Sequence, residues 1–198
     1  MAEAPLNLDC FTDKAKQGAS WDGATGYDAK AGQRNGGMLK FNRVHLMIGQ
    51  SYFRFCDRAR FAQDWHRAAT GPWWAEFETF TEIRDVARSS MTVKEHAART
   101  GCEPLAYAAK LHFAVPYEWG DCGAVIEARL IRRIDAYKGW GDIAYLDPNP
   151  VRQDSRDGGA KYIPLQKQEV FQLYIPEIWV HFDQAFAVVR KGPTSMFA

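Results

Sequence analysis

Residues 123–137 read GAVIEARLIRRIDAY, and this stretch decides the class of fold that the sequence predicts. Apolar and charged side chains alternate along it with a period of two, which is typical of a β-strand with one buried face. The two faces carry Val125, Glu127, Arg129, Ile131 and Arg133 on one side and Ile126, Ala128, Leu130 and Ile134 on the other. We therefore predict one long strand here.

Upstream of this strand, the sequence predicts two strands followed by helices. The strands cover LKFNRVHLMI at 39–48 and YFRFC at 52–56, with a turn at Gly49-Gln50 between them. After a possible short helix at 57–65, apolar residues at helical spacing predict a helix over roughly 79–89. A capping box of Thr92 and Glu95 opens the next helix, which closes at Gly101. A third helix covers 103–115, with Pro104 in its first turn.

Downstream, strand patterns resume in KYIPLQKQEVFQLYIP at 161–176 and end in FDQAFAVVRK at 182–191. Early strands, then two or three helices, then late strands without intervening helices favour an α+β fold with mostly antiparallel strands. The sequence contains no GxGxxG motif after a strand and no P-loop, so it gives no support to doubly wound nucleotide-binding folds.

A single domain is expected over residues 39–198. Residues 1–38 are rich in Gly, Ala, Lys and Asp and predict a loosely structured lead-in, with a turn at Asn35-Gly36-Gly37. Residues 138–160 are polar and rich in turn-forming residues, without periodicity, and predict a mobile loop.

Composition narrows the classes of partner. A net charge of +1, from 25 basic and 24 acidic residues, gives no sign of broad nucleic-acid binding. No apolar run is long enough to cross a bilayer, and the N-terminus lacks the pattern of a secretory signal. The four cysteines are scattered without metal-ligand spacing, so no metal is expected. These features favour a cytoplasmic protein, or one exported without a cleavable signal peptide.

Arg54 is the first candidate site residue. In SYFRFC, alternation places Tyr52, Arg54 and Cys56 on one face of a strand, opposite Phe53 and Phe55. A guanidinium on a strand with an apolar reverse face lies either at a solvated edge or in a cleft that binds an anion. We expect the cleft.

Three further candidates come from single stretches. GPWW at 71–74 places two tryptophans after a turn, where Trp74 is either a stacking surface or part of the core. Glu169 lies within a predicted strand, as a solvated edge residue or as a carboxylate presented into a cleft. His181 and Asp183 share a strand face if VHFDQ is extended, which leaves a hydrolase open as an alternative.

In order and spacing, residues 40–190 resemble the mono-ADP-ribosyltransferases of the R-S-E class, whose fold is a split β-sandwich that holds NAD. Arg54 in YFRF matches the early arginine of the family, and Glu169 in QEVFQLYIP matches the late glutamate. Ser89 and Ser90 in ARSSMT are the match to the middle serine segment. Lys167 stands where the family usually has Glu or Gln, two residues before the glutamate.

The resemblance implies an NAD-dependent ADP-ribosyltransferase or NAD glycohydrolase, a class that includes toxins and effectors. Arg54 would contact the phosphates of NAD, with Ser89 and Ser90 in the same site, and Glu169 would stabilise the cation formed when the nicotinamide–ribose bond breaks. Tyr52, Trp73 or Trp74 would stack on a ring of NAD, and the partner would be an acceptor protein. The alternative from the residues alone is a non-catalytic binding or assembly module that uses exposed aromatic side chains.

Overall fold

The structure, a computed structural model, describes residues 3–29, 32–113, 115, 120–142, 144–145, 161–162 and 171–198. The helices are α1 (Asp9–Thr12), α2 (Lys14–Thr25), α3 (Arg58–Gln63), α4 (Trp65–Ala69), α5 (Phe77–Ser89), α6 (Met91–Thr100), α7 (Pro104–Phe113) and α8 (Ile178–Ala185). The strands are β1 (Tyr27–Asp28), β2 (Gln33–Arg34), β3 (Met38–His45), β4 (Ser51–Cys56), β5 (Trp73–Glu76), β6 (Ala124–Leu130), β7 (Asp135–Gly141), β8 (Ala144–Tyr145), β9 (Lys161–Tyr162), β10 (Phe171–Tyr174) and β11 (Phe186–Pro193).

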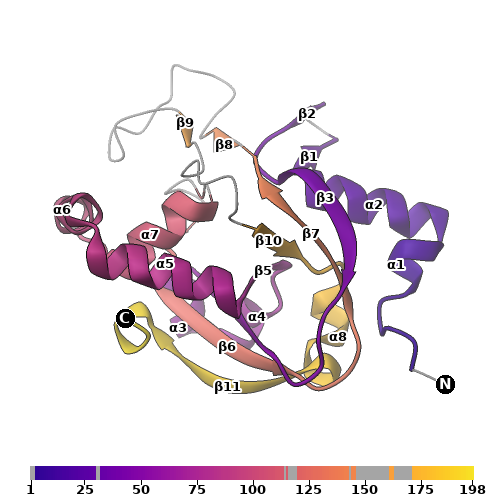
Figure 1. The fold of residues 1–198 in the computed structure, drawn as a ribbon. Helices are drawn as coiled ribbons and strands as arrows, with labels where there is room; N and C mark the ends of the chain where they lie inside the picture. Colours follow the sequence, from indigo (N-terminus) through magenta and orange to yellow (C-terminus); the bar gives the residue numbers. More distant parts are fainter. Residues whose placement is uncertain are drawn as a thin grey trace.

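A seven-stranded sheet in the order β11-β6-β4-β5-β10-β7-β3 organises the chain (Figure 1). Every pairing within it is antiparallel, which confirms the predicted α+β class with antiparallel strands. The short strand β5 joins the two halves of the sheet: it pairs with β4 through two residues and with β10 through two.

The stretch at 123–137 is not the single long strand that its alternation predicts. It divides into β6 and β7, which lie in different halves of the sheet. Between them the chain bends at Ile131 and Arg132, whose backbone N–H groups both donate to the carbonyl of Ala185, over 2.8 and 3.3 Å. Alternation predicts that a segment is extended and half-buried, but it does not predict where the chain passes from one half of the sheet to the other.

The two faces of the sheet carry different cores. One face buries a continuous cluster that includes Tyr52, Trp74 and Leu173. The opposite face carries two clusters, one under α5 and α7 around Phe53 and one under α1 and α2 around Tyr137. In Figure 1, β5 and β10 lie between these two groups of helices. Tyr52 and Phe53 therefore face opposite sides, as predicted for neighbours in a strand.

The predicted loose lead-in contains ordered helix. The side chain of Asp13 accepts hydrogen bonds from the N–H groups of Ala15 and Lys16 and so caps α2, which ends at the left-handed residue Gly26. Phe11 is buried in the core under α1 and α2. The high content of Gly and Ala predicted a loose chain. A helix forms instead because its N-terminus is capped, a left-handed glycine ends it and one side is buried.

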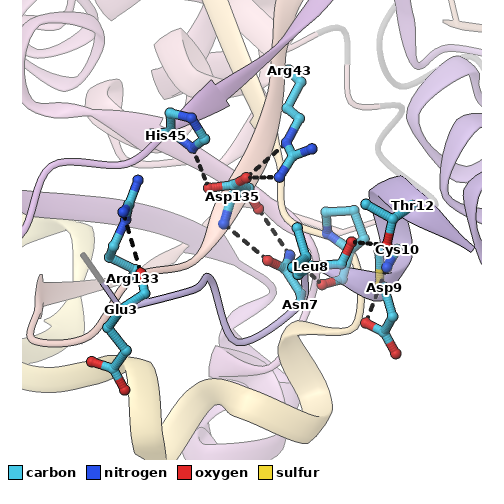
Figure 2. Close-up of polar contacts among 11 residues, drawn as sticks. Glu3, Asn7, Leu8, Asp9, Cys10, Thr12, Arg43, His45, Arg133 and Asp135 are labelled. Atoms are coloured by element: carbon cyan, nitrogen blue, oxygen red, sulfur yellow. Dashed lines mark hydrogen bonds and ion pairs between the residues drawn. The ribbon is translucent and has the colours of Figure 1, made fainter. Parts of the chain in front are cut away.

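Asn7 and Asp135 tie this N-terminal segment to the sheet (Figure 2). Asn7 Nδ2 donates to the carbonyl of Asp135 at 2.9 Å, and the Asp135 N–H donates back to Asn7 Oδ1 at 2.9 Å. The buried carboxylate of Asp135 is held by Arg43, with Nη2 at 2.5 Å, and by His45, with Nδ1 at 2.7 Å. These donors satisfy a buried charge, so we assign the group a structural role.

Three other local predictions differ from the structure. α6 is capped by Ser90, whose Oγ accepts from the N–H of Val93, and not by Thr92. The chain at 182–185 belongs to α8, so the last strand begins only at Phe186. Of the predicted mobile loop at 138–160, residues up to Gly141 belong to β7, and residues 143 and 146–160 lie outside the described part.

Among the described residues, no helix combines the length and the apolar character needed to cross a membrane.

Candidate functional site

A cleft of about 1130 Å³ lies where β4 and β5 separate. The two strands pair only at Tyr52–Glu76 and Phe53–Ala75, and the chain between them leaves the sheet through α3 and α4. The end of α7 forms one wall, the end of α2 forms another, and β10 contributes to the lining. The volume is slightly above the usual range of roughly 300–1,000 Å³ for small-molecule sites.

Arg54 lies at the point where the strands separate and is one of the residues that line the cleft. Its Nε donates to the carbonyl of Ala68 at 2.6 Å, and its Nη1 donates to the carbonyl of Trp73 at 2.8 Å. Gly71 permits this placement, since a Cβ there would come within 1.9 Å of Nη2. Burial lowers the pKa of Arg54, and the charge of Arg60 acts in the same direction.

Two more arginines, which sequence reasoning missed, line the same cleft. Arg60 and Arg67 are exposed residues of α3 and α4. Asp57 and Asp64 also line the cleft, and each caps a helix: Asp57 accepts from the N–H of Arg60 at 2.9 Å, and Asp64 accepts from the N–H of Arg67 at 3.0 Å. Within the part of the chain that the structure describes, none of the three guanidinium groups in the cleft has a carboxylate within 4.0 Å.

Aromatic side chains form the apolar part of the lining. Phe55 and Phe113 contact each other with ring centroids 5.8 Å apart, and Trp73 packs edge-on against Tyr174 at 5.0 Å. Cys122 also lines the cleft, and burial raises the pKa of its thiol to about 12. The thiol is therefore neutral at physiological pH and acts as a small apolar group.

Two of the predicted stacking residues are unavailable to a ligand. Tyr52 is 3% exposed and does not line the cleft, and its hydroxyl accepts from the N–H of Met47 at 2.8 Å. Trp74 borders the cleft but is 2% exposed, and its ring stacks on Phe186 at 5.2 Å. Both side chains belong to the continuous core cluster on their face of the sheet.

Ser89 and Ser90 do not join Arg54 in the cleft. They lie at the junction of α5 and α6, where the Oγ of Ser89 donates to the carbonyl of Asp85 at 2.6 Å and Ser90 caps α6. A Ser-Ser pair before a new helix satisfies backbone groups locally, which accounts for both residues. Glu169, the predicted catalytic residue, lies outside the described residues.

The predicted His181–Asp183 pair is not formed. Both residues belong to α8, where positions two apart point in different directions. The carboxylate of Asp183 instead lies 2.7 Å from Nε2 of His66. Nδ1 of His181 is buried and has no hydrogen-bond partner in the described chain. The hydrolase alternative therefore loses the pair on which it depended.

Asp9, Cys10 and Glu177 bring potential metal ligands within 4.8 Å of one another. The ammonium of Lys16 already occupies the two carboxylates, at 2.5 Å from Asp9 and 3.1 Å from Glu177. Burial, together with the charge of Glu177, raises the pKa of Cys10 to about 12. The cluster joins the N-terminal helices to the start of α8, and we assign it no metal.

Comparison of the chain with models of known protein families, with curated proteins and with solved structures gives no match.

Proposed function

We propose that the cleft binds NAD and that the protein is an NAD-dependent ADP-ribosyltransferase or NAD glycohydrolase. The observation that carries the proposal is the gathering of Arg54, Arg60 and Arg67 in one cleft without carboxylate partners in the described residues. Guanidinium groups that lack a carboxylate partner are available to an anion in the cleft. Guanidinium forks suit the oxygens of a pyrophosphate, and the aromatic lining suits the rings at its two ends.

Glu169 is the proposed catalytic residue. It stands three positions before Gln172, which lines the cleft. Breaking the nicotinamide–ribose bond develops positive charge on the ribose, and a carboxylate stabilises that charge electrostatically. Water as acceptor makes the protein a glycohydrolase, and a protein side chain as acceptor makes it a transferase. Of the residues proposed from the resemblance, Ser89 and Ser90 take no part, because both lie at a helix junction.

Calorimetric titration with NAD tests the binding step. The native protein is expected to bind NAD with micromolar affinity, and the double variant Arg60→Gln/Arg67→Gln at least about tenfold more weakly, because two charge-assisted contacts are lost. Arg88→Gln/Arg99→Gln is the matched control: it removes the same two charges from α5 and α6, away from the cleft. A folded native protein that does not bind NAD, or equal losses in all variants, refutes the proposal.

Product analysis tests the chemistry. Incubation with NAD is expected to release nicotinamide, and Glu169→Gln is expected to abolish that release while NAD still binds. Adding a cell extract and searching for ADP-ribosylated proteins by mass spectrometry separates transfer from hydrolysis. Nicotinamide release that persists in Glu169→Gln removes Glu169 from the mechanism.

We also propose that the protein acts in a reducing cytoplasm, its own or, as a toxin or effector, that of a target cell. All four cysteines are free thiols, and Cys10, Cys56 and Cys122 are buried. Fractionation of the source cells and of their culture medium tests this, and recovery from an oxidising compartment contradicts it.

The second candidate function is a protein-binding module. Trp179 and Val180 on α8 are 57% and 56% exposed, side by side in the sequence, on the face of the molecule away from α5 and α7. A pair of exposed apolar side chains of this kind is typical of interfaces. Two results together would favour the protein-binding module over the NAD-dependent enzyme: the native protein does not bind NAD, and Trp179→Ser abolishes the protein's activity in cells.

A further inference from the structure

Gln172 is a buried amide on β10 that faces the cleft. The residue is 6% exposed and lines the cleft, on the same side of the strand as Tyr174 and opposite Leu173. Its backbone pairs with β7 at Gly139, which offers no side-chain donor or acceptor. Its side-chain amide makes no hydrogen bond to any described residue.

The amide of Gln172 is open to the cleft, because it is not one of the fully buried polar groups of the described chain that lack a partner. A glutamine amide has one acceptor and two donors, and no described residue uses them. Neighbouring positions on the same strand are apolar or aromatic, namely Phe171, Leu173 and Tyr174. Both functions of the amide are therefore available to a ligand in the cleft.

The surroundings of Gln172 restrict the shape of that partner. Trp73 lies on the adjacent strand and lines the cleft, with part of its ring accessible. Gly26 and Gly37 also line the cleft and both have positive φ, 65° and 74°, and a Cβ on Gly37 would come within 2.3 Å of the backbone of Thr25. An aromatic ring and glycine backbone in the same lining suit a flat group.

We infer that Gln172 and Trp73 form a subsite for a planar, uncharged ring that carries a hydrogen-bond donor beside an acceptor, as a carboxamide or a nucleobase edge does. The inference rests on the proposed function, because it places the ring of the ligand at one end of the cleft whose arginines hold the phosphates. Gln172 is thus a specificity-determining residue, which selects a nucleotide over other phosphorylated molecules.

Gln172→Met tests the subsite, because methionine keeps the unbranched shape and removes the amide. We expect NAD to bind about tenfold more weakly, inorganic pyrophosphate to bind unchanged, and the Tm of the ligand-free protein to stay equal or rise. Separate titrations with nicotinamide and with adenosine show which ring occupies the subsite. The compound whose ring binds there should lose affinity in Gln172→Met, and the other should not. Gln184→Met, at an exposed position of α8 outside the cleft, is the matched control.

The outcomes separate the two proposals. NAD binding that is equally tight in Gln172→Met, or a lowered Tm together with lost pyrophosphate binding, overturns the subsite and leaves the proposed function standing. Adenosine or nicotinamide binding that depends on Gln172, with no binding of NAD or pyrophosphate, supports the subsite and overturns the NAD proposal. A folded protein that binds none of these probes overturns both.

Discussion

Gly71→Ala moves the Arg54 guanidinium without changing its charge. A Cβ at position 71 would lie 1.9 Å from Nη2 and 2.3 Å from Cζ of Arg54, distances that no real contact allows. The backbone of Gly71 is not in the left-handed region, so alanine is not strained there. The substitution therefore acts through the displaced arginine alone.

The size of the effect follows from the two hydrogen bonds that hold Arg54. The bonds to the carbonyls of Ala68 and Trp73 are 2.6 and 2.8 Å long. A hydrogen bond from a charged donor contributes about 1.5–3 kcal/mol, so losing both sets an upper limit of roughly 3–6 kcal/mol. A displaced guanidinium regains water in the cleft, which offsets part of this loss. We expect a decrease of about 2–3 kcal/mol in the free energy of unfolding, or roughly 4–12 °C in Tm for a chain of this size.

Urea unfolding measured by circular dichroism gives the free energy of unfolding, and calorimetry gives NAD binding, which should fall with the displaced charge. Gly18→Ala is the matched control: Gly18 is inside α2 with nothing within 4 Å of its Cβ position, so alanine there should stabilise by about 0.5–1 kcal/mol. Repeating Gly71→Ala in an Arg54→Met background completes the cycle. If the loss is as large there, or is absent in the native background, Arg54 is not the cause.

Three other predictions concern stability. Asn7→Ala removes three hydrogen bonds, two of them to Asp135, and should lower the free energy of unfolding by about 3 kcal/mol in urea; a loss below about 1 kcal/mol contradicts the anchoring role. Gly37→Ala should cost about 2–3 kcal/mol by the same measurement, because position 37 has φ of 74° and no room for a Cβ; a neutral result would show that the turn can rearrange. Burial raises the pKa of Tyr52 and Tyr174 from 10.0 to about 12, so the stability they contribute is complete below pH 10 and is lost as the pH rises to about 12. Burial also raises the pKa of Tyr137, so tyrosinate absorbance should show delayed ionisation of these three residues, and Tyr52→Phe should reduce the alkaline loss of stability.

The class of fold and several of its elements follow from local patterns in the sequence. The period of two in YFRF predicts a strand with Tyr52 and Phe53 on opposite faces, and helical spacing predicts the helix that the structure places at Phe77–Ser89. Gly101 ends α6 in the left-handed conformation, as its position suggested. These features are local, because periodicity and end signals depend on neighbours a few residues away.

Which residues share the cleft follows from the long-range arrangement of the strands. Arg54 was identified because a guanidinium on a strand with an apolar reverse face needs a reason, but Arg60, Arg67 and Gln172 carry no such local signal. They lie in the same cleft as Arg54 for two reasons. β4 and β5 separate, and β10 pairs with β5 through Leu173 and Trp74, which are 99 positions apart in the sequence. Long-range packing also explains why Tyr52 and Trp74 are core residues and not ligand contacts. A strand pattern predicts the face on which a side chain lies, but not which elements cover that face. Burial and pairing across the sheet are long-range properties, and the folded chain alone specifies them.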